Sequence, residues 1–338
     1  MYAPQNKYIL QAIQLWQECF GDGREWIEDY FSRFDAEKNL KYICLDGKLI
    51  SMLMCCSYTW IYYRFRLKFV YIAGVSTQKD ERKRDFASSL IRKTLTDLYY
   101  EGNELCGLIC ANEGLMSFYS RFGFSSACSS KQGLFSVDKS AETQDLNLSA
   151  EEINIERYLD FLKNFPSDRR VEHTKETLAL YNSDYYKPYA FFKGQSLHTV
   201  LIGAETENCF QIIDLRTCEE KELNQVFTIL ERRYNKDIRY IFHSETADNQ
   251  INLQMLRLIN AEKIIEIFAK ENPNLDLSFC LKDGIIKENN YRFTIHKGSL
   301  TKESYDTAIE PFCDNLVDIK DLCNFLLSGS YHSLMNEK

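Results

Sequence analysis

The chain has 338 residues, of which 45% are hydrophobic and 27% are charged, so it is long enough to fold into two or three domains. Its formal net charge of -8 argues against nucleic acid as a partner, because phosphate backbones are bound chiefly by Lys and Arg. An acidic surface suits a cationic partner instead, although many acidic proteins are merely soluble.

Several other classes are excluded by what the sequence lacks. No apolar segment approaches the roughly 20 residues that a membrane-spanning helix needs, so we expect no membrane association. Residues 1–20 lack the basic start and continuous apolar stretch of a signal peptide. The 12 cysteines and 5 histidines show no metal-ligand spacing, so no metal is expected. We expect reduced, mostly buried thiols in a cytoplasmic protein.

Local patterns predict alternating helices and strands over the first 124 residues. Two apolar runs flank the turn signal Asp46-Gly47, which predicts a β-hairpin. The expected elements are helices over 1–20 and 21–34, a hairpin over 41–60, a strand over 67–77, a helix over 85–102, a strand over 105–111 and a short aromatic helix over 116–124.

Two further segments follow a polar stretch, where a domain boundary near residue 145 is expected. The first repeats the amino-terminal layout but lacks a basic, glycine-bearing turn between its strand and its helix. Its expected elements are a helix over 168–181, a hairpin over 189–206, a strand over 209–215 and a helix over 218–234. The second is expected to have a strand and a helix over 255–269, a pair of strands over 275–300 and a closing helix over 318–329.

The stretch "ERKRDFASSL", residues 81–90, joins a buried strand to an amphipathic helix. Arg82, Lys83 and Arg84 run directly into Asp85, which opens the helix. Helix N-termini carry about half a positive charge and expose unpaired N–H groups, so this stretch suits a phosphate. The same residues also suit the solvated start of a surface helix, and taken alone they leave both interpretations open.

The order of strand, basic loop, helix, strand "LCGLICA" and segment "FYSRFGF" resembles the GNAT acyltransferase superfamily. In that family, the pyrophosphate of acetyl-CoA is wrapped by a short sequence motif. The motif consists of Arg or Gln, two residues of any type, Gly, one residue of any type, and then Gly or Ala. Arg82 and Ala87 match this motif, whereas Asp85 stands where its glycine belongs. The resemblance implies acetyl-CoA as co-substrate, Tyr119 as the general acid, and a coenzyme site formed by Val75, Thr77, Arg82, Lys83, Arg84, Asp85, Phe86 and Ala87.

The whole chain is similar to the Eis-type (enhanced intracellular survival) acetyltransferases, which have two GNAT-like domains and a sterol-carrier-like domain. The resemblance implies a coenzyme-binding GNAT domain over 1–145, a degenerate second GNAT-like domain over 146–253 and a sterol-carrier-like domain over 254–338. The expected fold class is therefore α/β (α+β), with mixed central sheets in the tandem GNAT domains and an α+β domain at the carboxyl end. The family often assembles into homo-oligomers, and the same is implied here.

The resemblance implies an N-acetyltransferase that moves an acetyl group from acetyl-CoA to a primary amine of a small molecule or peptide. Eis-type enzymes use the carboxylate of the chain terminus as the base, but here only "SYHSLMNEK" follows Gly329. A nearby acid such as Glu113, or an ordered water, is then the expected base. A pocket for the amine is expected from residues whose carboxylates and aromatic rings suit an ammonium group, namely Glu25, Trp26, Asp29 and Tyr30. The alternative is that these residues form only the solvent-exposed and buried faces of one helix.

Asp85 leaves two functions open. Its carboxylate repels a pyrophosphate, its side chain can cap the amides that a phosphate would take, and its Cβ narrows the approach to the backbone. The three cations beside it offset much of the repulsion. The chain is therefore either a working N-acetyltransferase or a non-catalytic GNAT-like binding or assembly protein with weakened coenzyme affinity.

Overall fold

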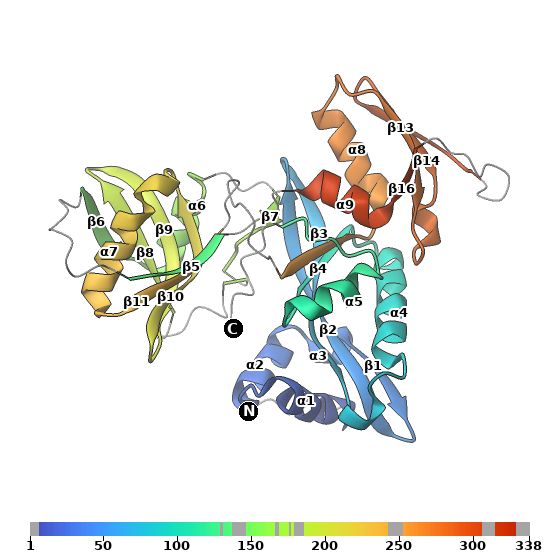
Figure 1. Cartoon of the computed structure of the whole chain (residues 1–338), viewed down its shortest axis with the longest axis horizontal. Helices are drawn as coiled ribbons and strands as arrows, with labels where there is room; N and C mark the ends of the chain where they lie inside the picture. Colours follow the sequence, from blue (N-terminus) through green and yellow to red (C-terminus); the bar gives the residue numbers. More distant parts are fainter. Residues whose placement is uncertain are drawn as a thin grey trace. The chain divides into compact units, whose positions relative to one another are not determined.

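The computed structural model describes residues 7–128, 131–136, 147–165, 169–175, 177–178, 186–242, 253–305 and 315–328 (Figure 1). The chain divides into two compact units. Unit 1 consists of Met1–Thr59, Phe65–Ala127 and Leu253–Leu326, and unit 2 consists of Trp60–Arg64, Cys128–Asn252 and Leu327–Lys338. Among the described residues, no helix is long and apolar enough to cross a membrane.

In the part of unit 1 that the structure describes, three helices lead into a mixed sheet with the strand order β1-β2-β3-β4-β12. Its elements up to the end of the first sheet are α1 (Lys7–Phe20), α2 (Arg24–Arg33), α3 (Ala36–Asn39), β1 (Leu40–Leu45), β2 (Lys48–Tyr62), β3 (Phe65–Thr77), α4 (Phe86–Tyr100), β4 (Leu105–Ile109), α5 (Met116–Ser120) and β12 (Gln254–Leu258). The hairpin predicted at Asp46-Gly47 is confirmed, since β1 pairs with β2 from Leu45 opposite Lys48. Both turn residues have a positive φ, as a two-residue hairpin turn of type I′ requires.

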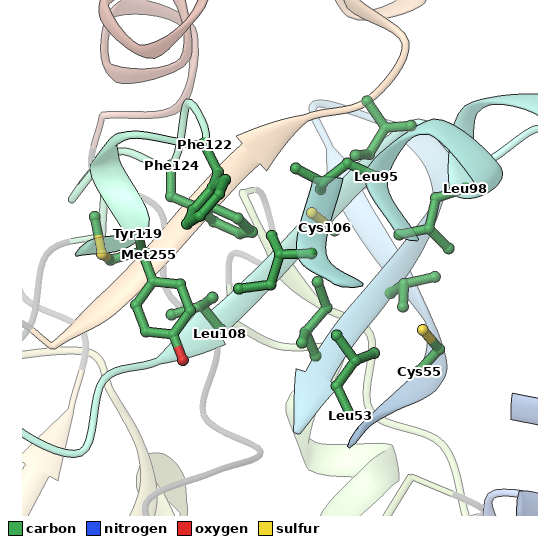
Figure 2. Close-up of a cluster of buried hydrophobic side chains, with 14 of the residues drawn as sticks. Leu53, Cys55, Leu95, Leu98, Cys106, Leu108, Tyr119, Phe122, Phe124 and Met255 are labelled. Atoms are coloured by element: carbon green, nitrogen blue, oxygen red, sulfur yellow. The ribbon is translucent and has the colours of Figure 1, made fainter. Parts of the chain in front are cut away.

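The core of unit 1 lies between α4 and this sheet. Leu90, Ile91, Leu95 and Leu98, four of the residues expected on the apolar face of α4, are all buried there. They pack with side chains from β2, β3, β4, α5, the segment after α5 and β12, including Leu53, Val70, Cys106, Tyr119, Phe124 and Met255. Figure 2 shows this cluster, with Phe122 and Phe124 on one side of it and Leu95 and Leu98 on the other.

The last strand of the first sheet comes from far along the chain. β12 pairs antiparallel with β4, with Gln254 opposite Ile109 and Leu258 opposite Leu105. Sequence analysis placed residues from 254 onward in a carboxy-terminal domain, and the division into three domains stays a prediction. The boundary expected near residue 145 falls within 137–146, which lie outside the described residues.

The carboxy-terminal part of unit 1 contains a second, smaller sheet with the order β15-β14-β13-β16. Its elements are α8 (Ala261–Glu271), β13 (Leu277–Lys282), β14 (Arg292–His296), β15 (Ser299–Glu303), β16 (Leu316–Asp318) and α9 (Ile319–Leu327), drawn in orange and red in Figure 1. The prediction of a pair of strands was therefore incomplete, because β15 and β16 extend the pair on both sides. Cys280 on β13 is disulfide-bonded, so the expectation of reduced thiols does not hold for this residue.

Unit 2 is built on a sheet with the order β5-β11-β10-β9-β8-β6. Its elements are β5 (Lys131–Phe135), β6 (Leu148–Glu152), α6 (Ile155–Leu162), β7 (Arg170–Val171), β8 (Tyr186–Lys193), β9 (Ser196–Glu205), β10 (Cys209–Thr217), α7 (Leu223–Tyr234) and β11 (Asp237–Phe242). The predicted hairpin β8–β9, strand β10 and helix α7 are confirmed. The helix expected over 168–181 is wrong where the chain is described, because β7 pairs there with Trp60 and Ile61 of β2.

A buried polar network lies at the end of β10, beyond its pairing with β11. Asp214 accepts a hydrogen bond from Arg216 Nη1 at 2.6 Å and lies 3.2 Å from His173 Nε2. Tyr158 of α6 donates to the same carboxylate. Asp214 is 2% exposed, yet its pKa is lowered, because the charge of Arg216 and the contact with His173 outweigh burial, which alone would raise it.

Candidate functional site

The two parallel strands at the centre of unit 1 separate after a short stretch of pairing. β3 and β4 pair only from Phe69 opposite Leu105 to Tyr71 opposite Gly107. β3 then continues to Thr77, and no described strand pairs with this last part on the side of β4. β4 pairs along its whole length with β12 instead. β3 and β4 therefore separate, and Val75 and Thr77, which the resemblance assigns to the coenzyme site, lie on the separated part of β3.

Gly74 holds the separated part of β3 against α1. It has a φ of +59°, and a Cβ added at this position would lie 2.2 Å from Cζ3 of Trp16. The indole of Trp16 therefore packs directly on the strand backbone, where no side chain fits. The same indole donates from Nε1 to Asp22 Oδ2 at 2.7 Å, so its position is fixed from both sides.

The β3–α4 loop, residues 78–85, is tied to the sheet at its beginning. Gln78 donates its backbone N–H to Ile50 O at 2.9 Å and its side-chain amide to Leu49 O at 2.6 Å. Arg82 Nε donates to Thr77 O at 3.1 Å, so this side chain folds back onto the end of β3. These bonds tie the loop to β2 and to the end of β3.

The three consecutive cations Arg82, Lys83 and Arg84 near the end of this loop have different surroundings. Arg82 is bound to Thr77 O, and its Nη2 also lies 3.6 Å from Cys19 Sγ. Arg84 pairs with Glu81 and stacks over the ring of Phe86 at 5.4 Å. Lys83 is exposed and pairs with no acidic group in the described part of the chain. Of the three, Lys83 is therefore the most available to an anionic ligand.

Asp85 adopts a backbone conformation that favours glycine. Its φ is 63° and its ψ is 7°, in the left-handed region, and Lys83 also has a φ of 63°. The residue at the position of the motif glycine thus retains the backbone geometry for which glycine is suited. Alternation of positive and negative φ, here across Lys83, Arg84 and Asp85, turns successive N–H groups to one side and forms anion-binding concavities.

The Asp85 carboxylate does not cap α4. No side-chain cap bond forms, because a capping side chain requires extended backbone at this residue. Asp85 Oδ2 instead accepts from Ser89 Oγ at 3.1 Å and from Arg92 Nη1 at 3.2 Å. The pKa of Asp85 is lowered, first by a hydrogen bond from Ser88, then by the bond from Ser89 and by the Arg92 charge.

The first turn of α4 consequently keeps its N–H groups for a ligand. Ser89 is the first residue with a helical bond, from its N–H to Asp85 O at 2.8 Å. The N–H groups of Phe86, Ala87 and Ser88 precede it, and the Asp85 side chain takes none of them. Together with the helix dipole, these N–H groups form a site that suits a phosphate group, such as those of a pyrophosphate.

Tyr119 lies on α5, near the opening between the strands. Its ring is packed edge-on against Phe118 and Phe124, with centroid distances of 5.0 and 6.0 Å. Figure 2 shows its hydroxyl pointing away from Phe122 and Phe124. The pKa of Tyr119 is raised, chiefly by burial and further by the neighbouring Cys110. Tyr119 therefore stays protonated at neutral pH, as a general acid must before it acts.

Two residues of β12 support this region and were missed by sequence analysis. Met255 lies beside Cys110, with 3.5 Å between the two sulfur atoms. Arg257, fully buried, donates from Nε to Phe122 O at 2.8 Å and pairs through Nη2 with Asp283 Oδ2 at 2.6 Å. The only available signal was an arginine inside an apolar strand, and nothing in the sequence showed that this strand joins β4.

The residues expected to line an amine pocket do not share one face of α2. Trp26 stacks on Tyr30 with a centroid distance of 5.1 Å, and Trp26 remains 38% exposed. The Tyr30 hydroxyl is buried 3.1 Å from Cys56 Sγ. Asp29 Oδ2 pairs with Arg33 at 2.6 Å, and Glu25 is exposed. The aromatic pair thus lies together, and the pocket stays a prediction.

The base is not placed by the structure. Glu113 is exposed in a short 3-10 helix, Glu113–Leu115, directly before α5. The terminal segment "SYHSLMNEK" lies outside the described residues. No group of three or more His, Cys, Asp or Glu side chains in the described part of the chain could hold a metal ion.

Comparisons with known proteins agree with this geometry. Residues 3–127 match a family model described as an acetyltransferase (GNAT) domain. No curated protein matches the chain. Among solved structures, a GCN5-related N-acetyltransferase from Anabaena variabilis is similar, with a TM-score of 0.74 and 17% identity over 96% of this chain and 88% of that one.

Two further structures cover nearly the whole chain. A conserved protein of unknown function from Enterococcus faecalis, titled a probable N-acyltransferase, has a TM-score of 0.76 and 13% identity over 95% of this chain and 88% of its own. Eis1 from Mycobacterium abscessus has a TM-score of 0.66 and 12% identity over 96% of this chain and 88% of its own. At these identities the likenesses show the fold, and they confirm the expected α/β class with mixed sheets. The amino-terminal part of the chain, residues 3–127, is thus similar to acetyltransferase domains of the GNAT type.

Proposed function

We propose that this protein is an N-acetyltransferase that moves an acetyl group from acetyl-CoA to a primary amine of a small molecule or peptide. The proposal rests chiefly on the conformation of Asp85. Its left-handed backbone keeps the shape of the motif glycine, and its carboxylate is turned toward Ser89 and Arg92. The first-turn N–H groups of α4 are thereby left for the pyrophosphate of the coenzyme.

Residues along the opening between β3 and β4 then serve successive parts of the coenzyme. The N–H groups of Phe86 and Ala87, with Lys83 beside them, would hold the pyrophosphate. The separated part of β3 around Val75 and Thr77 would lie along the pantetheine and supply a donor to the thioester oxygen. Tyr119 on α5 would then lie at the other side of the opening, with its buried, protonated hydroxyl facing the sulfur.

The reaction requires one bond to form and one to break. The neutral amine attacks the thioester carbonyl, a C–N bond forms, and the carbonyl oxygen carries a negative charge that a backbone N–H stabilises. When the C–S bond breaks, Tyr119 gives its proton to the departing sulfur, and the coenzyme leaves as a thiol. The proton lost from the amine passes to a base, for which we propose Glu113 or an ordered water.

We further propose that the chain belongs to the Eis type, with a degenerate second GNAT-like domain over 146–253, a sterol-carrier-like domain over 254–338 and a homo-oligomeric assembly. The likeness to Eis1 over 96% of the chain supports this proposal. In unit 2, the polar network of Asp214 and Arg216 occupies the end of β10, where unit 1 has its opening. This difference favours coenzyme binding by unit 1.

Calorimetry of acetyl-CoA into the wild type, Asp85→Gly and Asp35→Gly tests the function. Asp35 is a matched control, because it also precedes a helix in left-handed conformation, with a φ of 47° and no side-chain cap. We expect all three proteins to bind the coenzyme. Binding by Asp85→Gly alone would support the non-catalytic alternative, in which Asp85 closes the site. Absence of binding in all three would overturn the proposed function.

A further inference from the structure

The Asp85 carboxylate is held by side chains of α4, namely Ser88 and two residues further along the helix. Ser89 and Arg92 follow Asp85 by four and seven positions, so they lie one and two turns along the same face. Both reach Asp85 Oδ2, at 3.1 and 3.2 Å. Oδ2 thus bonds to side chains one and two turns further along the helix and caps none of the first N–H groups.

Arg92 is itself held in place by an aromatic ring in the turn that follows α5. Its guanidinium lies over Phe122, 5.4 Å from the ring centroid. Phe122 is 1% exposed and belongs to the core cluster drawn in Figure 2. A buried ring under a guanidinium favours one placement of that cation. The position of Arg92, and with it that of the Asp85 carboxylate, is therefore set by the packing of unit 1.

We propose that Arg92 is a positioning residue that compensates for the missing motif glycine by holding the Asp85 carboxylate clear of the coenzyme. This inference rests on the proposed function. Without Arg92, the carboxylate keeps only its bonds to serine hydroxyls and can turn toward the phosphate site. A charge that repels the pyrophosphate would then lie at the entrance of the β3–α4 loop.

A double-mutant cycle in acetyl-CoA affinity tests the proposal. Arg92→Gln should weaken acetyl-CoA binding about fivefold. This factor corresponds to the repulsion between the unpaired Asp85 carboxylate and a pyrophosphate charge a few ångströms away in water. In an Asp85→Asn background, the same substitution should change the affinity by about twofold or less, as for independent sites. Arg92→Lys should restore most of the affinity. The loss caused by Arg92→Gln should also shrink at high salt, where exposed charges are screened.

Arg121→Gln is the matched control for loss of a positive charge. Arg121 also lies over Phe122, at 5.9 Å, and its Nε donates to Phe118 O rather than to Asp85. We expect this variant to bind the coenzyme like the wild type. An Arg92→Gln loss that persists in the Asp85→Asn background would overturn the proposal, because Arg92 would then act on the coenzyme directly. Unchanged binding in Arg92→Gln would overturn it as well.

A measurement without coenzyme separates this inference from the proposed function. Carboxyl NMR of the protein labelled at aspartate reports the Asp85 titration, with the signal assigned by its loss in Asp85→Asn. We expect the pKa of Asp85 to rise in Arg92→Gln and to change less in Arg92→Lys. An Asp85 pKa that is the same in the wild type and Arg92→Gln would overturn the positioning role, even if acetyl-CoA binds.

Discussion

Replacement of Arg257 by Met should destabilise unit 1 more than loss of any surface ion pair. The Arg257 and Asp283 side chains are 0% and 1% exposed, and 2.6 Å separates Nη2 from Oδ2. Removing the cation leaves a buried carboxylate without its counter-charge, although Ile285, Ile286 and Asn289 still donate to it. Breaking a buried pair in this way costs about 3–5 kcal/mol.

Thermal unfolding of the Arg257→Met variant provides the assay. For a unit of about 200 residues, each kcal/mol shifts the melting temperature by about 2–4 °C, so we expect a fall of about 6–20 °C. Arg33→Met is the matched control, since Arg33 and Asp29 also lie 2.6 Å apart but are 37% and 51% exposed. Loss of such a surface pair costs about 0–1 kcal/mol. Equal melting temperatures for the two variants would refute the reasoning.

Three further outcomes follow from the same structure. Gly74→Ala should lower the melting temperature, because the added Cβ would lie 2.2 Å from Trp16. Gly21→Ala is the control, since Gly21 has a φ of +77° and no neighbour within 4 Å, and it should lower the melting temperature less. An equal effect of the two substitutions would point to backbone strain alone. Burial lowers the pKa of His173, so below its ordinary value of about 6.5 the unfolded chain binds a proton that the folded chain does not. Denaturation of unit 2 should therefore become easier as the pH falls from about 6.5 to 5, and His173→Gln should flatten this slope; an unchanged slope contradicts the assignment. Because the pKa of Tyr119 is raised, kcat should not decline up to about pH 10, and an earlier decline would argue against Tyr119 as the acid.

The parts of the fold that the sequence predicted are those with local signals. The hairpin at Asp46-Gly47 follows from a turn whose residues tolerate positive φ, and the apolar face of α4 follows from helical spacing. Helix α6 also had a local signal that was not used. Asn154 precedes it and accepts from the Arg157 N–H at 2.9 Å, as an N-cap residue does.

What the sequence could not show depends on long-range pairing and on backbone conformation. β12 lies more than a hundred residues after β4 in the chain, so only the folded structure reveals that Met255 and Arg257 support the region of Tyr119. At Asp85, residue preference indicated a helix cap, yet its left-handed backbone directs the carboxylate toward Ser89 and Arg92. Residue preference alone does not fix the φ of Asp85, and this φ decides whether the loop can bind a phosphate.

Release of coenzyme A thiol from acetyl-CoA, measured with a panel of primary amines for the wild type and Tyr119→Phe, tests whether the protein acetylates an amine with Tyr119 as the acid. We expect turnover of at least one amine by the wild type. We also expect a kcat loss of about 100-fold or more in Tyr119→Phe, because the leaving sulfur loses its proton donor. Coenzyme affinity measured by calorimetry should be unchanged in this variant. A Tyr119→Phe variant as active as the wild type, or a wild type that binds acetyl-CoA but acetylates no amine, would contradict these expectations.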